Sequence, residues 1–221
     1  MTPKKGTGLL MVWSDIPAEL EVEFNKWSNE EHLPELLELP GILNGARYEA
    51  VMGSPKHLSC YELENPLVLE SDAFKKFQEN RSEWSKTIST AKIATTLVNQ
   101  LFELIYPSQV APGVASSDMA PALQVGRMDV PGEIEDAFND WYNTIYVPNY
   151  EKVPGCIRGR RFKAVGGEPK YLVVYEFEHP KVSESAEWLY QREVSPVTAK
   201  IRPHLQFATG SPGIWVKTFQ L

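Results

Sequence analysis

The chain lacks the features that mark membrane-spanning, secreted and nucleic-acid-binding proteins. None of its apolar runs approaches the roughly 18 residues that a membrane helix needs. The short apolar run after Lys4 and Lys5 is not followed by a small-residue cleavage site, so a secretory signal is not expected. With 22 Lys and Arg against 29 Asp and Glu, the net charge of −7 argues against nucleic acid and anionic membranes as partners.

Cysteine and cofactor motifs are equally scarce. The two cysteines, Cys60 and Cys156, form neither a metal-binding pattern nor a disulfide framework, which favours a cytoplasmic location. There is no glycine-rich phosphate loop, no dinucleotide fingerprint and no G-x-S-x-G nucleophile elbow. No pair of histidines has the helical spacing of a zinc site. We therefore expect no metal and no cofactor, and a haem held by His32 or His204 is an alternative without positive support.

One long segment of the sequence occurs twice. Residues 15–66 align without a gap on residues 129–180, at a constant offset of 114, and 23 of the 52 pairs are identical. Two units of this length are too few and too long for a solenoid, so duplication of a small domain is the better interpretation. Residues 108–122, rich in Pro, Ala and Ser, are the predicted linker. The predicted repeats are therefore residues 1–107 and 123–221.

Each copy has the pattern strand, helix, strand, strand, helix, strand. Strands are predicted at 9–13, 45–51, 57–64 and 100–106, and again at 123–128, 159–165, 171–178 and 214–221. The first helix of each copy is expected to follow an N-cap at Asp15 or Asp129, and the second to cover 72–88 or 184–194. This order is that of the ferredoxin-like βαββαβ unit. Two such units, sheet against sheet, predict an α+β fold in which the antiparallel sheets form an intrachain pseudo-twofold barrel.

The stretch "FNKWSNEEHLP", residues 24–34, places a polar pair at the end of an apolar helix. At 100° per residue, Leu20, Phe24 and Trp27 share one apolar face. Glu31 projects into this face and His32 lies at its edge. The second copy has isoleucine and tyrosine at these two positions, so the fold does not require the polar pair.

His32 and Glu31 are the predicted catalytic residues, and each has a structural alternative. A histidine with a pKa near neutrality can accept and donate protons, although most lone histidines only fill structural positions. A buried carboxylate needs a partner. If the helix ends before Pro34, because a residue preceding proline disfavours helical geometry, Glu31 becomes a surface group instead.

Two arginines recur at equivalent strand positions, Arg47 and Arg161. Repetition in both halves favours a structural role, such as an ion pair with the repeated Glu62 and Glu176. A site for an anionic or carbonyl ligand is the functional alternative.

The predicted substrate-binding residues are aromatic and polar side chains of the strands and helix ends. Tyrosines on an inner strand face supply hydroxyls to a pocket, whereas packing aromatics need no function. His57 beside a turn and His179 at a strand end are expected to be exposed, and His204 is given no role. The predicted set is Trp13, Trp27, Arg47, Tyr48, Tyr61, Tyr146, Arg161 and Tyr175.

Residues 24–48 resemble the F-x-x-W-Y-x-x-x-H-L-P…P-G…R-Y segment of EthD-like proteins in the dimeric α+β barrel superfamily. Both halves resemble it, with Ser28 in place of the usual aromatic and Tyr146 in place of the histidine. The resemblance implies the barrel fold. It also implies a function among cofactor-free isomerases, cyclases, dehydratases and monooxygenases, haem enzymes and proteins of no known activity.

We therefore expect a cofactor-independent enzyme that uses general acid–base catalysis on a small hydrophobic substrate, aromatic, lactone or polyketide-like. The expected reaction is that of a lyase or dehydratase, an isomerase or a cyclase. A non-catalytic small-molecule-binding or stress-associated protein is the first alternative, and a cofactor-free or haem monooxygenase is the second. A small hydrophobic molecule is the expected partner, and homodimer formation is left open.

Overall fold

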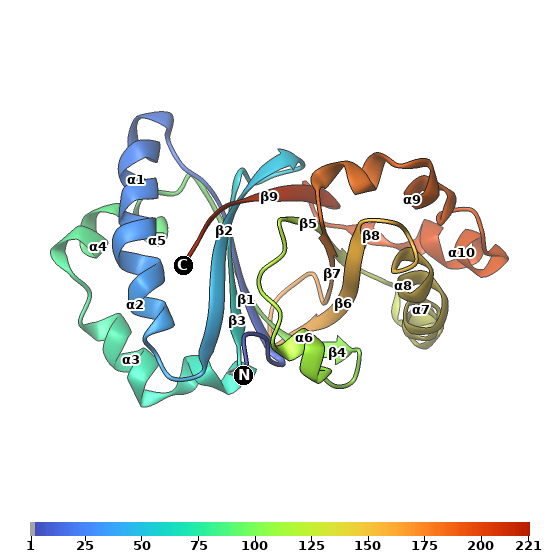
Figure 1. Cartoon of the computed structure of the whole chain (residues 1–221), viewed down its shortest axis with the longest axis horizontal. Helices are drawn as coiled ribbons and strands as arrows, with labels where there is room; N and C mark the ends of the chain where they lie inside the picture. The colour runs from blue at the N-terminus through green and yellow to red at the C-terminus, as the bar shows by residue number, and fades with distance from the viewer. Residues whose placement is uncertain (1–2) are drawn as a thin grey trace.

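The structure is a computed structural model that describes residues 3–221, and its centre is a closed antiparallel β-barrel (Figure 1). Eight strands form the ring in the order β7-β6-β4-β1-β3-β2-β9-β5, and β5 pairs with β7 to close it. The short strand β8 extends β5 outside the ring. The strands are β1 (Gly8–Asp15), β2 (Ile42–Met52), β3 (His57–Leu63), β4 (Thr96–Tyr106), β5 (Ala122–Asp129), β6 (Cys156–Ala164), β7 (Tyr171–Phe177), β8 (Gln206–Phe207) and β9 (Gly213–Gln220).

The two halves of the chain have the same strand order. The first half reads β4-β1-β3-β2 and the second reads β9-β5-β7-β6. They join at both edges, where β2 pairs with β9 and β4 pairs with β6. The predicted α+β barrel is therefore confirmed, and it closes through hydrogen bonds between strand edges rather than by face-to-face stacking of two separate sheets.

Helices cover the outer face of the barrel on two sides (Figure 1). Those of the first half lie at one side and those of the second half at the other. None of the helices within residues 3–221 has the length and apolar character to cross a membrane. The helices are α1 (Glu21–Trp27), α2 (Leu33–Leu37), α3 (Asp72–Glu79), α4 (Glu83–Ile88), α5 (Thr90–Ile93), α6 (Pro112–Ala115), α7 (Glu135–Trp141), α8 (Val147–Tyr150), α9 (Ala186–Tyr190) and α10 (Pro196–Ile201).

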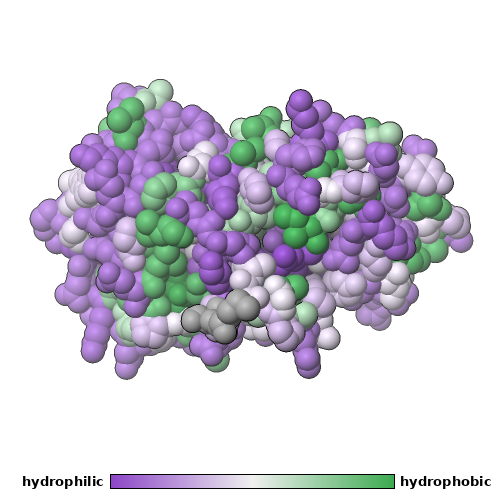
Figure 2. Space-filling view, viewed as in Figure 1, coloured by the Kyte–Doolittle hydropathy of each residue, from purple (hydrophilic) through white to green (hydrophobic). Residues whose placement is uncertain are grey.

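Strand alternation gives the barrel two buried faces. Successive side chains point to opposite sides of a strand, one into the barrel and one toward the helices. Side chains from both halves fill the barrel, among them Trp13, Tyr48, Phe162 and Trp215. Separate clusters fill the space between the helices and the outer face in each half. Polar side chains cover most of the visible outer surface, with hydrophobic side chains in separate groups (Figure 2).

A buried charge cluster, Lys5, Glu62, Arg160 and Glu176, lies among the barrel side chains. None of the four residues is more than 3% exposed. Nη2 of Arg160 lies 2.5 Å from Oε1 of Glu62 and 3.0 Å from Oε1 of Glu176. Nζ of Lys5 lies 3.5 Å and 3.8 Å from the same two carboxylates. The two positive and two negative charges compensate each other and link β3 of the first half to β6 and β7 of the second.

The ionisation of Glu62 follows from these contacts. Burial opposes the charged form, but the charges of Arg160 and Lys5 outweigh burial and hold the pKa of the Glu62 carboxyl below its usual range.

The helix-capping prediction at Asp15 and Asp129 is wrong. Both residues end strands, and each Oδ1 accepts a hydrogen bond from a hairpin amide, that of Lys56 at 2.8 Å or Lys170 at 2.7 Å. The carboxylates therefore fix strand ends to the neighbouring hairpins. The predicted helix at 72–88 is also divided, because Asn80 leaves helical geometry and Ser82 caps a new helix.

The predicted linker contributes to the core. It contains α6, and the backbone amides of Lys4 and Lys5 donate to the carbonyl of Ala115. Met119 and Ala120 lie within the barrel cluster, each 4% exposed. The segment therefore closes one part of the barrel interior.

Candidate functional site

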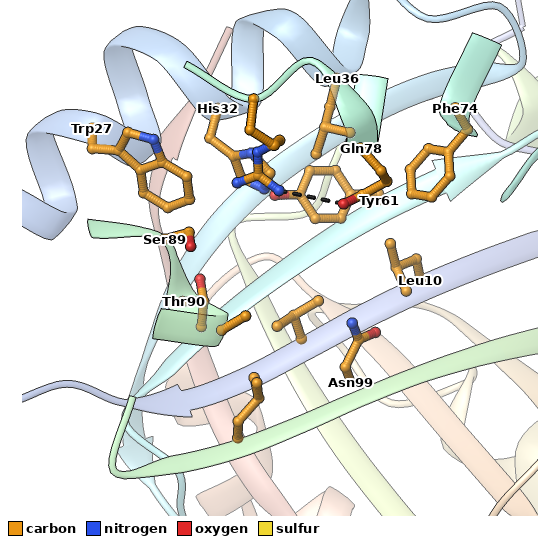
Figure 3. A pocket seen from close by; sticks show the side chains of 14 residues that line it. Leu10, Trp27, His32, Leu36, Tyr61, Phe74, Gln78, Ser89, Thr90 and Asn99 are labelled. Atoms are coloured by element: carbon orange, nitrogen blue, oxygen red, sulfur yellow. Dashed lines mark hydrogen bonds between the residues drawn. The ribbon is translucent and has the colours of Figure 1, made fainter. Parts of the chain in front are cut away.

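A pocket of about 160 Å³ lies between the helices and the outer face of the sheet in the first half (Figure 3). Its floor is formed by strand residues that alternate away from the barrel, including Leu10 and Val12 of β1 and Tyr61 of β3. Its roof is formed by the helical segment that carries Trp27, His32 and Leu36. Phe74, Gln78, Arg81 and residues 89–91 close the remaining side. The pocket is thus outside the barrel, between the sheet and the helices.

A π-helical turn sets the direction of the roof side chains. The helix does not end before Pro34, because the turn at Ser28–His32 connects α1 directly to α2. A π-turn adds one residue to each turn, so residue i+5 comes over residue i. The His32 ring therefore stacks on the Trp27 ring, with centroids 4.6 Å apart and an interplanar angle of 16°. The corresponding turn in the second half is Tyr142–Tyr146.

His32 lines the pocket as a neutral imidazole. Its ring lies against Phe77 as well as Trp27, and the Tyr61 ring meets it edge-on at 6.4 Å. Its Nδ1 is buried, with no hydrogen-bond partner among residues 3–221. Burial and the nearby positive charges of Arg81 and Arg47 lower the pKa of His32 to about 3. The near-neutral pKa assumed from the sequence is therefore wrong.

Arg81 brings a positive charge to the pocket, and sequence reasoning missed it. Its guanidinium lies over the Phe77 ring and donates to Oε1 of Gln78 at 3.4 Å, the dashed line in Figure 3. No ion pair within residues 3–221 includes Arg81, and its Nε is buried without a hydrogen-bond partner. The pocket thus combines apolar side chains and the uncharged polar side chains of Gln78, Ser89, Thr90 and Asn99 with one cation that forms no ion pair within residues 3–221.

Glu31 holds a segment of the pocket wall and is not among the residues that line the pocket. Its Oε1 accepts hydrogen bonds from Trp27 Nε1 at 3.1 Å, Ser82 Oγ at 2.6 Å and Ser85 Oγ at 2.8 Å. Burial opposes the charged form, but these hydrogen bonds and the charge of Arg81 lower the pKa of Glu31. Glu31 therefore fastens residues 80–93, which we call the cover segment, to the helical roof.

Replacing Glu31 tests this attachment. In Glu31→Ile, which copies the second half, three donors lose their shared acceptor, and we expect the cover segment to lose about 1–3 kcal/mol of local stability. Amide hydrogen exchange of residues 80–93 measures it. The exposed neighbour supplies the control, since Glu30→Gln should leave exchange unchanged. Unaltered protection in Glu31→Ile would show that the cover segment does not depend on this carboxylate.

Arg47 and Arg161 fasten helices to strands. Nη1 and Nη2 of Arg47 donate to Asn29 Oδ1 at 2.8 Å and Asn25 Oδ1 at 2.7 Å. Arg161 makes the equivalent bonds to Asn143 and Asn139. The predicted ion pairs with Glu62 and Glu176 are wrong, because those carboxylates face the barrel and Arg160 contacts both. Arg160 and Arg161 are adjacent in β6 and so point to opposite faces.

Trp13 and Tyr48 lie inside the barrel, away from the pocket. The Arg127 guanidinium lies 4.5 Å from the centroid of the Trp13 ring. The Tyr48 hydroxyl donates to the carbonyl of Ala120 at 3.0 Å. Of the residues predicted to bind substrate in the first half, Trp27 and Tyr61 reach the pocket.

The equivalent space in the second half is almost filled. Its pocket measures about 40 Å³, and Tyr146 and Tyr175 line it. Tyr146, Tyr150 and Trp188 stand at the positions of His32, Leu36 and Phe74. The three rings pack together, with centroids 4.7 Å apart between the two tyrosines and 4.1 Å between Tyr150 and Trp188. Larger side chains therefore occupy the volume that is open in the first half.

The other histidines lie outside the first-half pocket. His57, predicted to be exposed, is 2% exposed, and its Nε2 lies 2.8 Å from Oε1 of Glu21. His179 and His204 are exposed, as expected for His179. No group of three or more His, Cys, Asp or Glu side chains within residues 3–221 is arranged to hold a metal ion.

Comparison of sequences gives no relative. No protein-family model matches the chain, and no curated protein matches it either.

Comparison of structures gives matches over nearly the whole chain. A protein assigned as a monooxygenase, from Lactobacillus acidophilus, has 9% identity and a TM-score of 0.59, covering 97% of this chain and 95% of its own. An anthrone oxidase-like protein has 13% identity and a TM-score of 0.61, with coverage of 98% and 93%. A haem-binding protein from Thermus thermophilus has 14% identity and a TM-score of 0.58, with coverage of 99% and 94%. The chain therefore shares the ferredoxin-like α+β barrel fold of these proteins.

Proposed function

We propose that the first-half pocket binds a small molecule built on a single ring and that His32 accepts a proton or a hydrogen bond from it. The observation that carries this proposal is a neutral imidazole among apolar and uncharged polar side chains beside Arg81, a cation that has no carboxylate within ion-pair distance in the described chain. Protein pockets of this kind fix a ligand through a few polar groups in an apolar lining.

The size of the pocket limits the ligand. An apolar cavity of about 150 Å³ accommodates benzene, whereas pockets for drug-sized ligands measure about 300–1,000 Å³. At about 160 Å³, the pocket matches a single ring with one or two substituents. Trp27, Tyr61 and Phe74 offer flat surfaces to such a ring.

The low pKa of His32 limits the chemistry. The neutral imidazole is ready to accept a proton, but burial and two arginine charges destabilise the imidazolium that results. The proton can therefore remain only while negative charge forms on the ligand, and Arg81 stabilises that charge. This favours ligands with an acidic C–H, an enol or a phenol. Return of the proton to another carbon gives an isomer, and its transfer to a leaving hydroxyl gives water and a new double bond.

A cofactor-free oxygenase is the second candidate. The carbanion or enolate formed by proton loss is also the species that can react with dioxygen, and two of the structural neighbours are named as a monooxygenase and an anthrone oxidase-like protein. A non-catalytic small-molecule-binding protein would use the same hydrogen bond without turnover.

Haem does not fit the residues present. The first-half pocket is below the size that a drug-sized ligand needs, and the His32 ring stacks against the rings of Trp27 and Phe77, at centroid distances of 4.6 Å and 6.1 Å. The second-half pocket is smaller still, and no histidine lines it. We derive no step that involves haem.

Binding of 4-nitrophenol tests the proposal, because its phenol and phenolate forms absorb at different wavelengths. We expect one molecule per chain and a loss of at least about tenfold in affinity in His32→Gln, as for a lost hydrogen bond to a charged or acidic group. Arg81→Gln should shift the bound absorbance toward the phenol form. Nitrobenzene, which has no acidic proton, is the control ligand, and its affinity should not change in His32→Gln. Equal losses for both ligands would contradict a polar role for His32.

We also propose four properties of the chain that do not concern the pocket: its origin by duplication, its relationship to a family, its location and its oligomeric state. The repetition at an offset of 114 and the shared strand order support tandem duplication into repeats 1–107 and 123–221. The motif of residues 24–48 supports an EthD-like relationship. The composition supports a cytoplasmic location. A homodimer is compatible with the fold.

A further inference from the structure

The second-half pocket contains polar atoms that lack partners. Tyr175 is 2% exposed, and its hydroxyl is buried without a hydrogen-bond partner among residues 3–221. Oε1 of Gln124 is also buried without a hydrogen-bond partner among residues 3–221. Both residues line the pocket of about 40 Å³ between β5, β7 and the helices of that half. A buried polar atom without a partner, whether a donor such as the Tyr175 hydroxyl or an acceptor such as Gln124 Oε1, carries a free-energy cost, so these atoms indicate that a polar group occupies the pocket.

The charges around the pocket all have one sign. Arg192 and Arg202 line the pocket and are exposed, so they form its solvent-facing side. None of the ion pairs within residues 3–221 includes either arginine. No Asp or Glu lines the pocket. Two cations therefore stand at the opening of a pocket that contains hydroxyl groups and no negative charge, which attracts anions.

The tyrosines act as donors rather than as anions. Burial raises the pKa values of Tyr142, Tyr150 and Tyr175, so their hydroxyls keep their protons at neutral pH. The Tyr150 hydroxyl donates to that of Tyr146 at 3.2 Å and the Tyr142 hydroxyl donates to Met128 Sδ at 3.6 Å, so among residues 3–221 the hydroxyl protons of Tyr146 and Tyr175 have no acceptor. Rotation of the Gln124 amide turns its NH₂ group toward the pocket as a further donor.

We propose that this pocket binds a small inorganic or carboxylate anion of three or four heavy atoms, such as formate or nitrite, through the Tyr175 hydroxyl and the guanidinium groups of Arg192 and Arg202. The size follows from the volume, because each water-sized atom group needs about 10–15 Å³ of such space. The proposal does not depend on the function of the first-half pocket, which has a different lining.

Calorimetric titration with sodium formate tests the proposal, with formamide as a neutral ligand of the same size. We expect formate to bind and formamide to give no signal. Tyr175→Phe should weaken formate binding by about tenfold or more, as for the loss of one hydrogen bond to an anion. Arg202→Gln, at an exposed position, should weaken binding and reduce its dependence on salt without affecting folding.

The matched control is Tyr61→Phe, the same change at the equivalent position of the first half, which should leave formate binding unaltered. Equal binding of formate and formamide would indicate only displacement of ordered water and would overturn the proposal. Unchanged formate affinity in both Tyr175→Phe and Arg202→Gln, or absence of formate binding to the unaltered protein, would overturn it as well.

Discussion

Arg160→Met should reduce the free energy of unfolding by about 3–5 kcal/mol, the range found when one partner of a buried ion pair is removed. Arg160 contacts both Glu62 and Glu176, so its loss leaves two buried carboxylates with only the longer contacts to Lys5, at 3.5 Å and 3.8 Å, and from Arg158 to Glu176, at 3.7 Å. Free energies of unfolding of about 5–15 kcal/mol are usual for domains, so the expected loss is a large fraction of the total stability. Urea unfolding followed by circular dichroism measures the change.

The control for this variant is Arg158→Met. Nε of Arg158 lies 3.7 Å from Oε2 of Glu176, and the side chain is 17% exposed against 4% for Arg160, so its removal should cost less than the removal of Arg160. A similar loss in both variants would mean that side-chain packing, and not compensation of the carboxylates, explains the effect.

The pH dependence of Arg160→Met provides an independent check. In the unaltered protein, the pKa of Glu62 is lower in the folded than in the unfolded state. Its contribution is therefore present above the unfolded pKa and is lost as pH falls through the folded pKa. Without Arg160, the folded state should bind a proton more tightly than the unfolded state. Part of the lost stability should then return as the pH falls through the raised folded-state pKa of Glu62 toward its unfolded value.

Filling the first-half pocket should abolish ligand binding. The triple variant His32→Tyr, Leu36→Tyr and Phe74→Trp copies the side chains that occupy the second half, where the remaining space is about 40 Å³. We expect the affinity for 4-nitrophenol to fall by at least about 100-fold, which corresponds to about 2.7 kcal/mol. Overpacking costs about 1–3 kcal/mol, so thermal unfolding is measured alongside.

The reverse changes in the second half, Tyr146→His, Tyr150→Leu and Trp188→Phe, are the matched control. They should leave 4-nitrophenol bound to the first-half pocket with unaltered affinity. If filling the first half leaves the affinity unchanged in a folded protein, the ligand does not bind in that pocket.

The fold was predictable because its signals are local and repeated. Largely apolar strands such as residues 57–63 and 171–177 occur at the same positions of two matching segments, and each match supports the other. The ends of the helices and strands were harder to predict. Aspartate is a residue type that often caps helices, but the carboxylate of Asp15 instead accepts a hydrogen bond from the backbone amide of Lys56.

The site was predictable only in part. His32, Trp27 and Tyr61 meet in the pocket, because the repeat singled out the helix that carries two of them. Alternation could not tell which face of a strand lines a pocket, since both faces are buried in this barrel, so Trp13 and Tyr48, which lie inside the barrel, were grouped with residues on the outer face of the sheet. Arg81 and Phe74 were missed because the position of the cover segment and α3 over the sheet is a tertiary feature.

One signal in the sequence pointed to the missed residues. The pair Leu36 and Tyr150 and the pair Phe74 and Trp188 differ in size at the same offset of 114 as His32 and Tyr146. Three larger side chains in the second half at equivalent positions indicate a filled pocket there. Only the structure shows that the three side chains are in contact.

A crystal structure of the complex with 4-nitrophenol is the most direct test of the proposed site. We predict one molecule in the first-half pocket, with its ring against Trp27 or Tyr61 and its hydroxyl oxygen at hydrogen-bonding distance from the ring nitrogen of His32. A molecule bound instead in the barrel, in the second half or with its hydroxyl turned away from His32 would contradict the proposal.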